Sequence, residues 1–425
     1  MVGRVLMVAF HFPPMRGSSG IQRSLAFVRH LPHYGWQPAV LSAHPRAYAE
    51  RGDELAVPPG VTVARPFALD TTRHLSWRGR YTRLLALPDP WVSWLLGALP
   101  AGLRLIRRLR PAVIWSTYPI ATAHLIALLL HRWTGLPWVA DMRDPMVDDV
   151  VPADPLKRRV YSWLERQIVR HASVMVFTAP GTLRLYAQRY PGLAPERMQL
   201  IENGYDEDDF RAAAQQPPPA RRPGALQLLH SGAVYPAERD PIPLFDALAA
   251  LKRRGAISAA SVSVVLRASG HDNYLRPLLR ERGIDDLVTL APYLPYHAAL
   301  AEMVASDGLL LLQAANCNDQ LPAKLYECLR AGRPLLALTD PAGDTAAALR
   351  HAGIASIAPL DSQTAIAQAL SVFLDQLARG QAALPAAGAA AACSRRARSA
   401  QLAGLLDRLT RSAGQQSAPP PWRVS

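Results

Sequence analysis

The chain has 425 residues, of which 50% are hydrophobic, and a formal net charge of +14 at pH 7. This length and composition exclude a wholly disordered protein and provide for two domains, each with its own core. The positive charge favours an anionic partner, which could be nucleic acid, a membrane surface or a phosphorylated substrate. Cys317, Cys328 and Cys393 have neither zinc-site spacing nor an even count for disulfides, which fits a reducing cytosol.

Short apolar runs alternate with helical patterns in the first half of the chain. This alternation predicts a parallel, doubly wound sheet with helices on its faces. The expected strands are residues 5–9, 38–42, 112–116, 138–140 and 173–177, and the expected helices are 21–31, 121–132 and 157–171. The N-terminal apolar run is too short for a signal peptide. The apolar stretch 121–130 contains His124 and is far shorter than the roughly 20 residues that cross a bilayer, so we expect no membrane span.

A second alternating series follows a proline-rich polar segment at residues 211–224, which we expect to link two domains. Its expected strands are residues 226–230, 261–266, 288–290 and 308–312, and its expected helices are 243–253, 274–282 and 296–306. We therefore expect domains at residues 1–210 and 225–380. Residues 381–425 should hold an alanine-rich segment, a basic helix at 395–409 and a disordered tail.

One stretch of the second series carries a cation and a carboxylate on a helix between two strands. Pro322 suits the first helical position and Gly332 ends the helix, so Lys324 falls in the first turn and Glu327 one turn further in. In parallel units, ligands gather at the carboxyl ends of the strands, where a helix N-terminus favours phosphate. Glu327 can accept the paired hydroxyls of a ribose. The alternative is a surface ion pair between Glu327 and Arg330.

The second domain opens with a strand that enters a loop containing Ser231 and Gly232, two small residues that permit close backbone approach to a ligand. Arg239 follows in the same loop. If it points toward Lys324, the two cations could hold a diphosphate from opposite sides. The alternative is that Arg239 caps or solvates its own loop.

Two segments of the first domain also follow expected strands. The loop with Gly17, Ser19 and Gly20 can approach phosphate or sugar with its backbone, although it lacks the GxGxxG pattern and could be a plain connection. The charged segment 141–149 follows the strand at 138–140, so its side chains should emerge at a carboxyl end; the alternative is a salt-linked turn.

Two further segments invite a ligand interpretation. Spaced carboxylates at residues 206–209 suit a divalent metal, but their place before a helix favours N-capping and solvated charge. Residues 77–110 interleave tryptophans, leucines and arginines. This segment could rest on an anionic membrane surface or could be a core helix with an arginine outer face.

On these motifs the chain resembles the GT-B-fold glycosyltransferases of glycosyltransferase family 4, a retaining, nucleotide-sugar-dependent group found in bacterial surface-polysaccharide pathways. The resemblance covers nearly everything before the C-terminal tail. It is carried by the glycine-bearing first loop, Asp141-Met-Arg-Asp-Pro145, Glu202-Asn-Gly-Tyr-Asp206, the segment from Gly232 to Arg239, and above all Pro322-Ala-Lys-Leu-Tyr-Glu327 with Gly332-Arg-Pro334.

The resemblance implies an α/β fold of GT-B architecture, with two Rossmann-like doubly wound domains that face each other across a cleft. The first would bind the acceptor and the second the nucleotide sugar, and the C-terminal helix would pack back on the first domain. The implied catalytic residues are Arg239, Lys324, Asp141 and Arg143. The implied donor-binding residues are Ser231, Gly232, Asp319, Leu325 and Glu327, and the implied acceptor-binding residues are Gly17, Ser19, Gly20 and Asp144.

Within this set, Glu327 would bind the ribose, and Arg239 and Lys324 would neutralise the departing diphosphate, so that neither a metal nor another cofactor is needed. Asp319 stands where the family commonly has a glutamate that contacts the sugar, one methylene longer.

The implied function is retaining transfer of a sugar, commonly a hexose, from a nucleoside-diphosphate sugar to a glycan or lipid-linked acceptor in bacterial surface or exopolysaccharide synthesis. It would take place in the cytoplasm, with or without peripheral contact to the inner face of an anionic membrane. The alternatives are a sugar-nucleotide epimerase of the same fold, a transferase-like protein without turnover, and a basic nucleic-acid-binding protein. The last is disfavoured because the charge is dispersed and no nucleic-acid motif is recognised.

Overall fold

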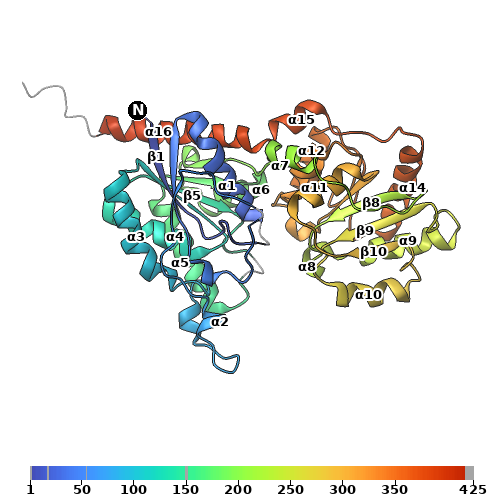
Figure 1. Ribbon diagram of the computed structural model, residues 1–425, viewed down its shortest axis with the longest axis horizontal. Coiled ribbons are helices and arrows are strands. Elements are labelled where there is room, and N and C mark those ends of the chain that lie inside the picture. The colour runs from blue at the N-terminus through green and yellow to red at the C-terminus, as the bar shows by residue number, and fades with distance from the viewer. Residues whose placement is uncertain (1, 17–18, 54, 149–151, 417–425) are drawn as a thin grey trace, which may run out of the picture. The chain divides into compact units, whose positions relative to one another are not determined.

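The computed structural model describes residues 2–16, 19–53, 55–148 and 152–416, which form two compact units (Figure 1). The first unit comprises the chain up to Glu202 together with the segment that begins at Arg395, and the second comprises Asn203–Ser394. Each unit contains one parallel sheet with helices on its faces. The predicted α/β, doubly wound class is therefore confirmed.

The described residues of the first unit build a seven-stranded parallel sheet in the order β3-β2-β1-β4-β5-β6-β7. Its strands are β1 Gly3–Val8, β2 Trp36–Leu41, β3 Thr62–Ala64, β4 Val113–Thr117, β5 Trp138–Arg143, β6 Val174–Phe177 and β7 Met198–Leu200. All five strands expected from the sequence are present. The two that were not expected, β3 and β7, are edge strands of three residues, too short to show a periodic pattern.

Helices cover both faces of this sheet (Figure 1). They are α1 Ser19–His30, α2 Thr71–His74, α3 Trp94–Leu109, α4 Ala121–Thr134, α5 Pro155–His171, α6 Pro180–Arg189 and α16 Arg395–Gln416. Helix α16 packs on α1 and buries Leu402 and Leu406 against the β1 side of the core. The Trp36 indole also donates a hydrogen bond to Asp407 (2.9 Å), so the C-terminal helix is an integral part of the first unit.

The described residues of the second unit form a six-stranded parallel sheet in the order β10-β9-β8-β11-β12-β13. Its strands are β8 Leu226–Ser231, β9 Val262–Arg267, β10 Val288–Ala291, β11 Gly308–Leu312, β12 Leu335–Leu338 and β13 Ile357–Ala358. Its helices are α7 Glu207–Ala213, α8 Pro236–Arg239, α9 Ile242–Arg253, α10 Asp272–Glu281, α11 Tyr296–Ala305, α12 Lys324–Ala331, α13 Asp344–His351, α14 Gln363–Ala378 and α15 Ala387–Ala392. As expected, β11 is buried along its whole length.

Two boundaries differ from the sequence-based expectation. The chain does not divide at the proline-rich segment 211–224, because α7 before it packs with α11 of the second unit. Strand β5 does not end at Ala140 but continues to Arg143, with an irregular register between Asp141 and Arg143. Within the described ranges, no helix combines the length and the apolar character needed to cross a bilayer.

Candidate functional site

In the second unit, the loop after β8 lies close to the start of α12. Gly232 follows the last residue of β8, Ser231, and has φ +144°, a conformation that other residues rarely adopt. Its N–H donates to the Arg267 carbonyl (2.9 Å), and a Cβ at this position would lie 3.8 Å from Cε of Lys324. The glycine therefore allows the loop to turn sharply at the strand end, next to the lysine.

Lys324 and Glu327 form an ion pair in the first turn of α12, with Nζ 2.9 Å from Oε2. The Tyr296 hydroxyl donates to the other carboxylate oxygen, Oε1 (2.8 Å). Glu327 is buried, whereas the Lys324 side chain is 34% exposed. The alternative pairing of Glu327 with Arg330 is wrong, because the Arg330 guanidinium donates to both carboxylate oxygens of Glu207.

The start of α12 corrects one detail of the prediction. Pro322 is not the first helical residue. Its carbonyl accepts the N–H of Leu325 (2.9 Å), which closes a turn before the helix begins at Lys324. Leu325 is fully buried, and Asp319 lies exposed in the loop upstream. The C-terminal end is as predicted, with Gly332 in the left-handed conformation (φ +64°).

The positive charges of Arg239 and Lys324 both affect the pKa of His230, a buried histidine in β8. Burial, helped by the positive charges of Arg239 and Lys324 and opposed by a hydrogen bond to the Leu310 carbonyl (3.1 Å), lowers the pKa of His230 to about 4. The imidazole is therefore neutral at pH 7. Arg239 itself donates to the Ala233 carbonyl (3.0 Å). Arg239 thus binds its own loop, which is the alternative that the sequence left open, while its charge and that of Lys324 both influence His230.

Sequence reasoning missed two of these groups. His230 immediately precedes the Ser-Gly pair at the strand end, a position that could have marked it. Tyr296 is far from Glu327 in the sequence, and no pattern in the chain connects them.

In the first unit, Asp141 lies within β5, near its carboxyl end, but its side chain is fully buried and does not emerge there as the sequence predicted. Both of its oxygens accept hydrogen bonds from Arg23 of α1, Oδ2 from Nε (3.0 Å) and Oδ1 from Nη2 (2.7 Å). Thr117 donates a further hydrogen bond to Oδ2 (2.8 Å). Arg23 also donates to the carbonyls of Ile201 and Glu202. Asp141 thus anchors α1 and the residues after β7, a role that the sequence did not reveal.

Arg143 is held in a strained, buried position at the end of β5. Its φ is +57°, unusual for a residue other than glycine, and its side chain is 8% exposed. Nη1 donates to the Tyr118 carbonyl (3.1 Å), whereas Nε is buried without a hydrogen-bond partner among the described residues. Burial lowers the pKa of Arg143, and Asp144 and Asp141 oppose the shift.

Gly20 and His11 lie directly against this guanidinium. A Cβ on Gly20 would come 2.4 Å from Nη1 of Arg143 and 2.8 Å from Nδ1 of His11. Burial, helped by the charge of Arg143, lowers the pKa of His11 to about 3, so this imidazole is neutral. Burial also raises the pKa of the neighbouring Asp144, and Arg143 opposes that shift. The structure thus brings Gly20, Arg143 and Asp144 together and adds His11, which sequence reasoning missed.

The structure says less about the two other residues predicted in the glycine-bearing loop, Ser19 and Gly17. Ser19 is the first residue of α1, and Gly17 lies outside the described residues.

The acidic segment 206–209 is a helix start, and the capping interpretation is confirmed. Asp206 accepts the N–H of Asp208 at the N-terminus of α7. Glu207 binds Arg330, and Asp209 lies 3.2 Å from Nε2 of His297. Among the described residues, no group of three or more His, Cys, Asp or Glu side chains is arranged to hold a metal ion.

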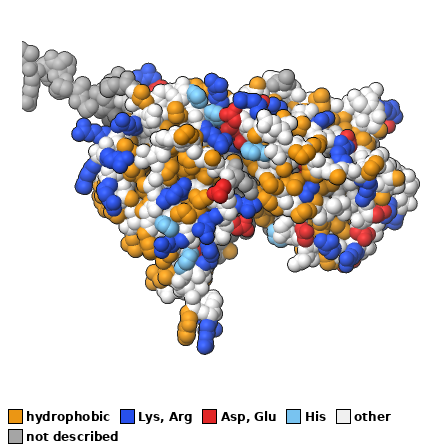
Figure 2. Space-filling model, in the orientation of Figure 1, with side chains coloured by type: hydrophobic (Ala, Val, Ile, Leu, Met, Phe, Trp, Pro, Cys, Tyr) orange, Lys and Arg blue, Asp and Glu red, His pale blue; other side chains and the backbone are white. Residues whose placement is uncertain are grey.

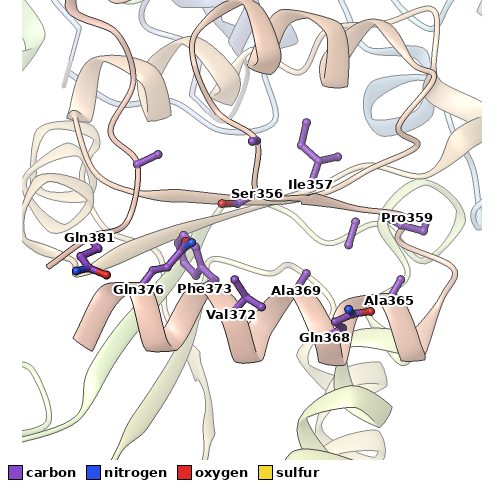
Figure 3. Close-up of a pocket in the computed structure, with 13 residues that line it drawn as sticks. Ser356, Ile357, Pro359, Ala365, Gln368, Ala369, Val372, Phe373, Gln376 and Gln381 are labelled. Atoms are coloured by element: carbon purple, nitrogen blue, oxygen red, sulfur yellow. The ribbon is translucent and has the colours of Figure 1, made fainter. Parts of the chain in front are cut away.

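A groove of about 450 Å³ lies elsewhere in the second unit, between α14 and the segment at edge strand β13 (Figure 3). Its apolar walls are alanine side chains together with Ile357, Pro359, Val372 and Phe373, and the polar groups among them are Ser356 and three glutamines. None of the predicted site residues lines it. The groove therefore offers space without the charges that the predicted chemistry requires.

Comparisons with known proteins agree with this architecture. Residues 19–204 match a family model described as a glycosyl transferase 4-like domain. No curated protein matches the chain. The two parallel α/β units have the GT-B fold found in solved glycosyltransferase structures.

Three solved structures illustrate the likeness. Alpha,alpha-trehalose 6-phosphate synthase from Burkholderia multivorans is 13% identical with a TM-score of 0.69, and the alignment covers 100% of both chains. Sucrose-phosphate synthase from Thermosynechococcus elongatus is 15% identical with a TM-score of 0.62, covering 97% of this chain and 98% of the other. Anabaena HepE, solved in complex with UDP and glucose, is 12% identical with a TM-score of 0.56, covering 97% and 99%. At these identities the likeness concerns the fold.

Proposed function

We propose that this protein is a glycosyltransferase that moves a sugar from a nucleoside-diphosphate sugar to an acceptor. The observation that carries the proposal is the Lys324–Glu327 pair at the start of α12, which lies beside Gly232 at the end of β8, with Arg239 in the loop that follows Gly232. The family match over residues 19–204 and the HepE complex with UDP and glucose support it.

In this proposal, Glu327 binds the ribose and the two cations bind the diphosphate. Tyr296 and Lys324 hold one carboxylate oxygen each, which fixes the direction of the remaining lone pairs toward two neighbouring hydroxyls. Negative charge grows on the diphosphate as the bond to the sugar breaks. Arg239 and Lys324 stabilise that charge from fixed positions, which lowers the barrier and lets them serve in place of a metal ion.

His230 keeps the phosphate region from acquiring a third charge. Because its pKa is about 4, it stays neutral at pH 7 and supports the loop through the Leu310 carbonyl. Gly232 lets the diphosphate approach the backbone at the strand end, where any larger residue would be strained.

We assign acceptor orientation to Arg143, Asp144 and Gly20 of the first unit. A buried guanidinium whose Nε has no partner among the described residues is stabilised by an anionic ligand. This favours an acceptor that carries phosphate, such as a lipid-linked intermediate of surface-polysaccharide synthesis. Asp141 is a positioning residue in this scheme because Arg23 and Thr117 occupy its oxygens. Retention of configuration would follow from attack on the same face of the sugar that the diphosphate leaves.

A thermal-shift experiment tests the donor site. We expect one of the UDP-, GDP-, dTDP- or ADP-sugars to raise the apparent melting temperature in the presence of EDTA, since a ligand that binds the native state stabilises it. The shift should disappear in Glu327→Ala and persist in Glu281→Ala, a control that removes an exposed carboxylate from the same unit.

The outcomes separate the alternatives. No shift with any nucleotide sugar would overturn the donor assignment. A shift accompanied by an altered sugar, in a reaction that contains the donor alone, would favour an epimerase over a transferase.

A further inference from the structure

The segment 71–87, called here the arginine–aromatic projection, extends from the first unit beyond α2 (Figure 1). Its tip is a tight turn. Trp77 and Arg80 exchange two backbone hydrogen bonds, Trp77 N–H to Arg80 O (2.8 Å) and Arg80 N–H to Trp77 O (3.0 Å). Arg78 and Gly79 between them both have positive φ, +51° and +76°. This turn gives the backbone of the tip a defined shape.

The projection exposes large hydrophobic side chains that a protein core would normally bury. Trp77 is 77% exposed and Leu84 is 70% exposed, and Leu75, Tyr81 and Leu85 are each between 43% and 48% exposed. Contiguous exposed apolar surface of this kind marks a site of interaction. The space-filling view shows hydrophobic and basic side chains together at this projection (Figure 2).

The charges on the projection all have one sign. Residues 71–87 contain four arginines and no aspartate or glutamate. Arg83 pairs with Asp154 and Arg73 donates to the Tyr48 carbonyl (2.8 Å), so both hold the base of the projection in place. Arg78 and Arg80 are exposed at the tip, and the Arg78 guanidinium lies 5.0 Å from the centre of the Trp77 ring.

The base of the projection is attached at the carboxyl edge of the first sheet. Tyr48 follows β2 and Asp154 caps α5, which follows β5. Asp89, just after the projection, accepts the N–H of Thr122 (2.7 Å) in the first turn of α4, which follows β4. The projection is thus fixed to the same edge that carries Arg143.

We propose that the arginine–aromatic projection docks on an anionic lipid bilayer. Trp77 and Leu84 enter the headgroup region, where tryptophan is favoured because its ring is apolar and its N–H can remain hydrated. Arg78 and Arg80 bind lipid phosphates. A combination of aromatic, leucine and arginine side chains without acidic residues matches such a surface better than it matches a protein interface, whose core is depleted of charge. Docking would bring the edge with Arg143 close to lipid-borne acceptors.

Cosedimentation of the full chain with vesicles tests this inference. We expect binding to mixed vesicles of phosphatidylcholine and phosphatidylglycerol, weak binding to phosphatidylcholine alone, and loss of binding at high salt. Trp77→Ser with Leu84→Ser should weaken binding about tenfold or more. Arg78→Ser with Arg80→Ser should weaken it by about 25-fold, since each arginine near an anionic surface contributes about fivefold.

Trp133→Ser is the matched control, because Trp133 is 57% exposed on α4 of the same unit and lies outside the projection. Unchanged circular dichroism would show that each variant is folded. The inference is overturned if no vesicle is bound, if the projection variants bind as the parent does, or if Trp133→Ser weakens binding equally. It is also overturned if the projection holds a second copy of the chain, seen as a dimer that the projection variants abolish.

Vesicle binding requires no nucleotide sugar, so its failure would leave the thermal-shift result for the donor site intact. Conversely, if vesicles are bound but no nucleotide sugar raises the melting temperature, the membrane-docking inference stands and the proposed transfer reaction is overturned.

Discussion

The carboxyl edges of the two sheets both contain a buried ion pair, but they differ in how exposed their other cations are. Each has a buried arginine–carboxylate pair joined by two hydrogen bonds, Arg23 with Asp141 in the first unit and Arg267 with Glu302 in the second (2.8 and 2.6 Å). The remaining cations differ, because Arg143 is buried and strained whereas Lys324 is partly exposed. Buried pairs thus hold each edge together, and the ligand roles proposed above fall to cations that are accessible or incompletely paired.

The largest expected effect comes from breaking a buried pair. Asp141→Ala should lower the free energy of unfolding of the first unit by about 3–5 kcal/mol, because it leaves Arg23 buried without its counter-charge. Urea unfolding followed by tryptophan fluorescence reports on this unit, since residues 203–394 contain no tryptophan.

Asp144→Ala is the control, because Asp144 follows the same strand and has no arginine that binds both of its oxygens among the described residues. Equal stability losses for the two variants would contradict the distinction between an anchoring and a ligand-facing carboxylate. Glu302→Ala, followed by circular dichroism, extends the comparison to the equivalent pair of the second unit.

The next largest effect is expected on kcat, from removal of Lys324. Lys324→Ala should lower kcat by about 10²–10³-fold, the usual cost of removing a group that stabilises developing negative charge, with little change in the stability of the first unit. Lys252→Ala is a close control, since Lys252 is one of the three lysines of the chain and forms an exposed ion pair with Asp286 in the same unit. A kcat for Lys324→Ala equal to that of the control would remove the lysine from the proposed mechanism.

The third prediction concerns His230, whose neutral form should make the stability of the folded chain depend on pH. The pKa of His230 is about 4 in the folded chain against 6.5 as the ordinary value, so between pH 6.5 and 4 the unfolded chain binds a proton that the folded chain does not. Stability should therefore fall as the pH drops through this window, by up to about 3 kcal/mol at pH 4. Chemical unfolding by circular dichroism should show a shallower decline for His230→Gln. An identical decline in both proteins would place the titrating group elsewhere.

The smallest effect tests the close packing around Arg143. Gly20→Ala introduces a Cβ that must displace Nη1 of Arg143, and we expect the acceptor KM to rise about 5–30-fold, which corresponds to about 1–2 kcal/mol. Gly192→Ala in the same unit is the control, because a Cβ there meets nothing within 4 Å. A normal KM in Gly20→Ala would show that the guanidinium position does not matter for the acceptor.

The positions of some candidate-site residues could be predicted because they depend on local sequence. Lys324 and Glu327 are three residues apart on one helix, and that spacing alone places them on the same face. Ser231 and Gly232 were recognisable because small residues followed an apolar run. Tyr296 and Arg23 were not recognisable, since each meets its carboxylate across a long separation, 31 residues for Tyr296 and 118 for Arg23.

The alternation of strands and helices, the α/β class and the helix that carries Lys324 and Glu327 could be predicted from the sequence, because hydrophobic periodicity and helix-ending residues act over a few positions. The remaining features depend on contacts between distant segments. Edge strands β3, β7 and β13 exist through pairing with a neighbour, and α7 joins the second unit through its contact with α11. Asp141 and Arg143 lie two residues apart in one strand, but Asp141 pairs with the Arg23 guanidinium of a distant helix, whereas Nε of Arg143 has no hydrogen-bond partner among the described residues. Such contacts join segments that are distant in the sequence, so a pattern of neighbouring residues cannot predict them.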